Sequence, residues 1–112
     1  MADATDANRR IHTRRKARIQ ARLSTGPDAV EGTIENIGEG GVFFATEDLE
    51  LNVEEGSDVV VSFRCTKAGA AAALERKGCV LRMERYFDGV AVVRAFAIKF
   101  DDLMAVDDLS FD

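Results

Sequence analysis

Residues 17–23 read ARIQARL, and apolar and polar side chains alternate along the whole stretch. Successive side chains of a β-strand point to opposite faces of its sheet, so this alternation predicts a strand with one buried face. The side chains expected on that face are Ala17, Ile19, Ala21 and Leu23. The segment therefore favours a fold built from half-buried β-strands.

Five more segments have the composition of strands, and turn residues separate them. They are Val30–Ile37, Val42–Thr46, Val59–Cys65, Cys79–Tyr86 and about Val90–Phe100. The dipeptide Asp88-Gly89 between the last two favours a hairpin turn with positive φ. Short strands with a turn signal between each pair indicate an all-β barrel.

The alternation also predicts which side chains face the core. Cys79, Leu81 and Met83 would share one face of their segment. The phenylalanines expected in the core are Phe43, Phe44, Phe63, Phe96 and Phe100.

Two segments are less regular. Lys67–Lys77 contains the run Ala70–Ala73, which has high helix propensity. A helical turn and a long hairpin tip both fit it; we expect a loop, with the next strand beginning near Leu74. In residues 101–112, Leu103, Val106 and Leu109 have helical spacing. The fold predicted is a six-stranded antiparallel β-barrel with a short C-terminal helix.

Composition narrows the class of protein. The chain has 112 residues, of which 46% are hydrophobic, and this fits one domain. No apolar run reaches the roughly 18 residues that span a bilayer, and residues 1–10 lack an apolar signal region. We therefore expect a cytoplasmic protein without membrane insertion. One histidine and no CxxC motif argue against a metal site. No serine or cysteine lies in a recognisable catalytic context, so we expect no enzyme and no cofactor.

Charge is distributed unevenly along the chain. Residues 1–26 hold seven basic and two acidic residues, whereas the remainder holds 8 basic and 18 acidic residues. A basic head on an acidic body indicates a localised anion site. It argues against DNA or RNA, which would need a basic face. Residues 1–8 are small and polar, and we expect a disordered tail there before a domain at 9–112.

Two motifs stand out along this chain. Residues 9–14 read RRIHTR and contain an RxxxR pair at Arg10 and Arg14. Residues 36–41 read NIGEGG and lie where one predicted strand turns into the next. Taken alone, an arginine-rich segment is usually solvated and a glycine-rich turn is usually only a turn.

The order of these motifs resembles the PilZ family, in which RxxxR precedes a [D/N]xSxxG motif by some 20–30 residues. Arg10 and Arg14 match the first motif, and Asn36 and Gly41 match the ends of the second. Residues 53–57 and 95–100 are similar to later parts of the family pattern, so the resemblance covers about residues 9–103. The departure is Gly38, which stands where the family has a serine and lacks its hydroxyl.

The resemblance implies a PilZ-like barrel that binds cyclic di-GMP. The ligand-binding residues it implies are Arg9, Arg10, Arg14, Asn36, Gly38 and Gly41. It also implies a receptor that acts through an unidentified output protein in motility, biofilm or secretion control, as a monomer or weak dimer. The alternative is a PilZ-like interaction module that does not bind cyclic di-GMP, and loss of the serine at position 38 favours it. A small RNA-binding barrel is a third reading, which the acidic body disfavours.

Overall fold

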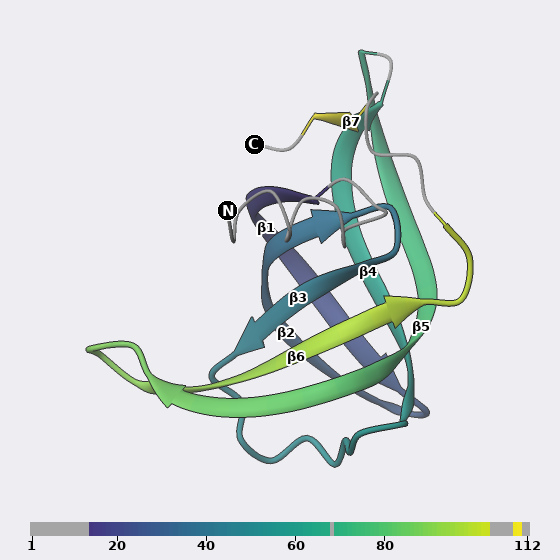
Figure 1. Ribbon diagram of the computed structural model, residues 1–112. Helices are drawn as coiled ribbons and strands as arrows, with labels where there is room; N and C mark the ends of the chain where they lie inside the picture. The colour runs from purple at the N-terminus through teal and green to yellow at the C-terminus, as the bar shows by residue number, and fades with distance from the viewer. Residues whose placement is uncertain (1–13, 68, 104–108, 111–112) are drawn as a thin grey trace, which may run out of the picture.

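The computed structural model describes residues 14–67, 69–103 and 109–110 (Figure 1). Seven strands follow one another along these residues. They are β1 (Arg14–Thr25), β2 (Asp28–Gly38), β3 (Gly41–Thr46), β4 (Asp58–Lys67), β5 (Ala70–Phe87), β6 (Val92–Phe100) and β7 (Leu109–Ser110). Within the described residues, no helix has the length and apolar character needed to cross a membrane.

Six of the strands form a closed ring. The order of neighbours is β1-β2-β3-β6-β5-β4, and β4 pairs in turn with β1. Every one of these pairings is antiparallel. β7 adds to the outer end of β4, opposite Thr66 and Lys67. The predicted six-stranded antiparallel barrel is therefore confirmed.

The inward-facing side chains fill the ring. In β1 the predicted alternation holds at Ile19, Ala21 and Leu23, which are buried, while the side chain of Ala17 is not among those described. Phe44 and Phe96 are fully buried at the centre, with ring centroids 6.4 Å apart and an interplanar angle of 30°. Burial of such aromatic surface is the main favourable contribution to folding.

Four of the five predicted core phenylalanines are buried: Phe44, Phe63, Phe96 and Phe100. Phe43 differs, because it is only half-buried and packs on the outer face of the sheet. It lies there against a second, smaller cluster formed by Ala45, Val93 and Ala95.

The loop expected at Lys67–Lys77 is wrong. β5 begins at Ala70 and pairs with β4 without interruption, from Lys67 opposite Ala70 to Asp58 opposite Cys79. Gly69, with φ +82°, lies at the tip of this hairpin. The alanine run forms a strand despite its helix propensity, because β4 satisfies its backbone hydrogen-bonding groups. Ala72 and Leu74 also pack against the core, which favours the extended conformation.

The predicted C-terminal helix is not seen. Asp101–Leu103 form a bend and an irregular residue, and Leu109–Ser110 form β7. Residues 104–108, on which most of that prediction falls, lie outside the described residues, as does the predicted tail at 1–8.

β5 has 18 residues and extends beyond the ring at both ends. At one end it forms the β4–β5 hairpin, and at the other it forms the β5–β6 hairpin, which projects far to the left in Figure 1. The turn of this second hairpin contains Asp88-Gly89, and Gly89 has the expected positive φ, +99°.

A buried arginine fixes the long connection between β3 and β4. Arg94 in β6 is only 8% exposed. One guanidinium nitrogen donates to the Leu51 carbonyl at 2.7 Å, and the other donates to the Val53 carbonyl at 3.5 Å. The guanidinium also lies 5.0 Å from the centroid of the Phe96 ring. The connection is thus held against the barrel by charge-assisted hydrogen bonds and a cation–π contact.

The core predicts a contrast between two phenylalanines. Phe44→Ala should destabilise the protein by about 3–5 kcal/mol, because it empties the centre of the barrel. Phe87→Ala, at a side chain that is 66% exposed, should change stability by less than about 0.5 kcal/mol. Urea unfolding followed by circular dichroism measures both, and equal losses in the two variants would contradict this assignment of the core.

Candidate functional site

The pairing of β1 with β2 brings the two sequence motifs together. Arg14 lies opposite Gly38, and Lys16 lies opposite Asn36. The end of the RxxxR motif is thus on the strand next to the NIGEGG motif, although 21 residues lie between Arg14 and Asn36 in the sequence. Arg9 and Arg10 lie outside the described residues, and Arg14 is placed by its backbone.

A β-bulge in β2 turns Asn36 outward. Strict alternation from Val30 through Ile34 would put Asn36 inside the barrel and Ile37 outside. The register shifts between Ile34 and Asn36, so that Glu35 is the extra residue. As a result Ile37 is fully buried, whereas Asn36 is only half-buried.

A pocket of ≈ 350 Å³ lies over this part of the surface. Asn36, Gly38 and Gly41 line one side of it. The facing side comes from β5, β6 and the residues after β6. It includes Leu81, Arg82, Lys99 and Leu103. The pocket therefore combines an amide, two cations and exposed apolar side chains, a mixture typical of small-molecule sites.

A second bulge places two consecutive residues of β5 beside this pocket. Val80 pairs with Ile98, but Arg82 pairs with Ala97, so Leu81 is extra. Leu81 and Arg82 therefore both face outward, and Met83 turns inward against the core. The predicted common face for Cys79, Leu81 and Met83 is wrong, because Leu81 is 56% exposed.

The cations of the pocket are available for a ligand. Arg82 Nε lies 3.9 Å from the Glu84 carboxylate, and both side chains are largely exposed. Such a surface ion pair contributes little free energy and is easily exchanged for another partner. Lys99 alternates with the buried Ile98 and Phe100, and is itself exposed.

The motif glycines have different structural roles. Among the described glycines, positive φ occurs at Gly26, Gly56, Gly69 and Gly89, so neither Gly38 nor Gly41 requires glycine for that reason. Gly41 is needed for close approach, since a Cβ there would collide with the backbone oxygen of Ile98 in β6. Gly38 ends β2 and is buried beneath the pocket surface that it helps to line.

Comparison with known proteins identifies the class. The model of the PilZ domain family matches residues 8–109. The chain therefore belongs to the PilZ domain family. Among solved structures, it is similar to the Bacillus subtilis inhibitor of motility, MotI/DgrA, with a TM-score of 0.70 and 16% sequence identity. The likeness covers 87% of this chain and 44% of that one, and at this identity it shows the fold alone. No curated protein sequence matches the chain.

Sequence reasoning missed the facing side of the pocket. Lys99 could have been found, because it alternates with two predicted core residues. Leu81 and Arg82 could not, because nothing in the residue pattern marks the bulge that turns both outward. In the described part of the chain, no group of three or more histidine, cysteine or acidic side chains has metal-binding geometry.

We predict that Gly41→Ala destabilises the barrel even without ligand. The added methyl group must push β3 away from β6 at the residue where the two strands meet, which weakens their hydrogen bonds. Thermal unfolding should show a clearly lower Tm than for the parent protein. Leu103→Ala, at an exposed side chain of the same pocket, is the control and should melt like the parent. An unchanged Tm for Gly41→Ala would contradict a structural need for this glycine.

Proposed function

We propose that this protein is a cyclic di-GMP receptor that conveys the level of the second messenger to a partner protein. The observation that carries the proposal is the register of β1 and β2, which puts Arg14 opposite Gly38 and Lys16 opposite Asn36 beside the pocket. Membership of the PilZ family supports it, because PilZ domains are typically receptors of this nucleotide and not enzymes.

The chemistry of the surface suits such a ligand. Cyclic di-GMP has two phosphates and two guanine bases. Guanidinium groups bind phosphate and the guanine O6/N7 edge in bidentate fashion, and they stack on purines. Arg9, Arg10 and Arg14 would supply these groups. Asn36 offers both a donor and an acceptor to a base edge, and Gly38 lets the ligand approach the backbone. Gly41 lines the same pocket and keeps β3 close to β6.

The facing side of the pocket extends this arrangement. Arg82 and Lys99 would supply positive charge on the side of the ligand away from β1. Leu81 and Leu103, both exposed, would offer apolar surface to a guanine ring. Together the two sides provide charge for both phosphates and flat contacts for the bases.

Transmission to the partner would follow from ordering. Ligand binding would hold the arginine segment at 9–14 against the barrel and so change the surface that a partner meets. MotI/DgrA, which has a similar fold, is named as an inhibitor of motility. By analogy we propose motility control as one output, alongside biofilm or secretion control, in a cytoplasmic protein that is a monomer or weak dimer.

A second candidate function rests on Gly38. The residue that replaces the serine of the motif has no hydroxyl to contact a ligand. A PilZ domain that has lost this contact can act through protein contacts alone. The alternative is therefore an interaction module that does not bind cyclic di-GMP.

We predict that Arg10→Ala and Arg14→Ala each remove most binding of cyclic di-GMP. Losing a charge-assisted contact to phosphate costs about 1.5–3 kcal/mol, or roughly 10- to 150-fold in Kd. Isothermal titration calorimetry measures the affinity, and thermal melts check that the fold is intact. Arg64→Ala, an exposed arginine of β4 that does not line the pocket, is the matched control and should bind like the parent.

The same titrations should depend on salt. The ligand is a dianion and the basic charge is local, so affinity should fall as ionic strength rises. If both arginine variants bind as tightly as the parent, the site assignment is wrong. If the parent itself does not bind, the interaction module is the correct reading.

Gly38→Ser should strengthen binding. The φ of Gly38 is not positive, so a side chain can be accommodated without backbone strain of that kind. A restored hydroxyl can donate one hydrogen bond to the ligand, worth roughly 0.5–1.5 kcal/mol, or several-fold to about tenfold in Kd. Calorimetry and a melting curve of the same variant measure affinity and stability together. Weaker binding at unchanged stability would show that the position does not face the ligand.

A further inference from the structure

The tip of the β5–β6 hairpin exposes an apolar cluster. Phe87 and Val92 lie directly opposite each other, and they are 66% and 41% exposed. Val90, in the turn between them, is 89% exposed. Figure 1 shows that this hairpin projects beyond the barrel, away from the other strands. Single exposed apolar residues are common, but three that lie together at the end of a projection point to an interaction site.

The turn holds these side chains in a defined arrangement. The Asp88 carboxylate accepts hydrogen bonds from the backbone N–H groups of Val90, at 2.8 Å, and Ala91, at 2.9 Å. The N–H of Asp88 donates to the Ala91 carbonyl at 3.1 Å. The two N–H donors hold the pKa of the Asp88 carboxyl below its ordinary value. The tip is thus preorganised, which lowers the entropic cost of binding a partner.

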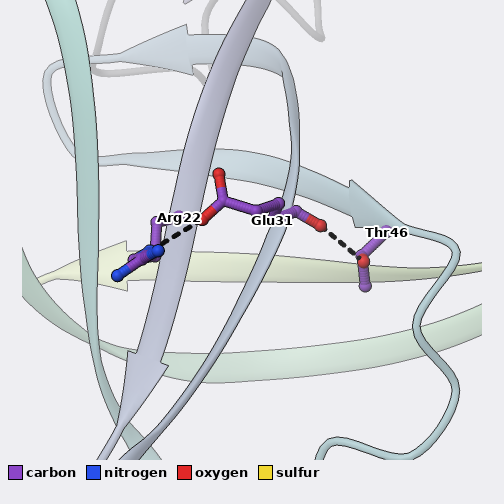
Figure 2. Close-up of polar contacts among 3 residues, drawn as sticks. All are labelled: Arg22, Glu31 and Thr46. Carbon is purple, nitrogen blue, oxygen red and sulfur yellow. Dashed lines mark hydrogen bonds and ion pairs between the residues drawn. The ribbon is translucent and has the colours of Figure 1, made fainter.

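An acidic groove begins at the same turn. Its volume is ≈ 500 Å³, and Asp88 is one of its lining residues. The other carboxylates that line it belong to Glu31, Glu35 and Glu47, against one cation, Arg18. Figure 2 shows that Glu31 is paired with Arg22, whose Nε donates to its carboxylate at 2.7 Å. Thr46 holds the same residue by donating to its carbonyl at 2.8 Å.

With Glu31 paired to Arg22, three carboxylates remain against the single cation Arg18, so the groove keeps an excess of negative charge; they are Glu35, Glu47 and Asp88. The environment of Tyr86, at the edge of the groove, agrees. Burial raises the pKa of its hydroxyl, and the negative charges of Glu35, Asp88 and Glu84 raise it further. A cationic side chain would be attracted to this groove.

We propose that the hairpin tip and the acidic groove together form a docking surface for a partner protein with a basic segment that also carries apolar side chains. The apolar side chains would pack on Phe87, Val90 and Val92, and the basic ones would enter the groove beside Asp88. Charge complementarity selects this occupant. An anionic membrane would be repelled. A second copy of the chain would bring an acidic body together with its basic head, so self-association is a separate outcome of the test.

The hairpin tip lies apart from the candidate ligand pocket on the same strand, whereas the groove extends along β2 to Glu35, next to the pocket residue Asn36. Phe87 is five residues beyond Arg82, which corresponds to roughly 17 Å along β5. The docking proposal does not require cyclic di-GMP, and it applies equally to a ligand-free interaction module. Its failure is therefore separate from failure of the receptor proposal.

A basic amphipathic peptide of lysine and leucine, labelled with a fluorophore, is the probe for this surface. Fluorescence anisotropy should show that it binds the parent protein. Phe87→Ser combined with Val90→Ser should raise its Kd about tenfold or more, because the apolar contacts are lost and the charge is unchanged. Ala73→Ser, at an exposed apolar residue of β5 that lines neither the pocket nor the groove, is the matched control and should bind like the parent. The same peptide with glutamate in place of lysine should not bind.

Several outcomes would overturn the proposal. They are absence of peptide binding, equal binding by the double variant, or NMR shift changes outside residues 84–93 and the groove. Self-association of the parent that the double variant abolishes would identify a second copy as the occupant instead. Val90→Ser alone replaces the double variant if that variant melts early. Cyclic di-GMP titration of the double variant should match the parent, which keeps the two functions distinguishable.

Discussion

Closure of the ring by the pairing of β1 with β4 is the constraint on which the rest of this structure depends. Ala21 through Ser24 of β1 lie opposite Phe63 through Val60 of β4. Once these edges meet, every strand must keep one face toward a narrow interior while it bends around the core. Bulges absorb that bending, and they occur in β1, β2 and β5.

The bulges have a consequence for function, because each extra residue exchanges the two faces of a strand. In β2 the exchange buries Ile37 and leaves Asn36 outside. In β5 it brings Leu81 and Arg82 to the same outer face. The polar and cationic residues of the candidate site are thus placed by the same distortions that let the barrel close. Close packing between strands is a further constraint on the barrel. A Cβ at Gly32, Gly41 or Gly78 would collide with the backbone of a neighbouring strand.

The sequence predicts the features of this structure that depend on neighbouring residues, and it does not predict those that depend on long-range strand pairing. The alternation at 17–23 and the Asp88-Gly89 turn are local. The structure confirms the buried positions of the first at Ile19, Ala21 and Leu23, and the positive φ of the second at Gly89. The helix propensity of Ala70–Ala73 is also local, but neither a helix nor the expected loop forms there, because the long-range pairing with β4 makes the run part of a strand. The bulges depend on closure of the whole ring, so they could not be read from the residues. For the site, the sequence supplied the two motifs, which the structure places on the neighbouring strands β1 and β2, whereas Arg82 borders the pocket only because of a bulge.

β5 connects the candidate ligand pocket with the proposed docking surface. Near its middle the strand presents Arg82 to the pocket beside Asn36, and at its end it presents Phe87 to the exterior. From Arg82 to Phe87, β5 is paired with β6, and the hydrogen bonds of Asp88 close the turn that joins the two strands. A rigid element of this kind passes on a displacement but does not create one. A ligand that draws Arg82 toward β1 would shift the hairpin as a unit. Glycine in place of the motif serine at position 38 would weaken binding of the ligand and leave the structure of the hairpin tip unaltered. The same fold can therefore retain its docking surface while its response to a nucleotide changes.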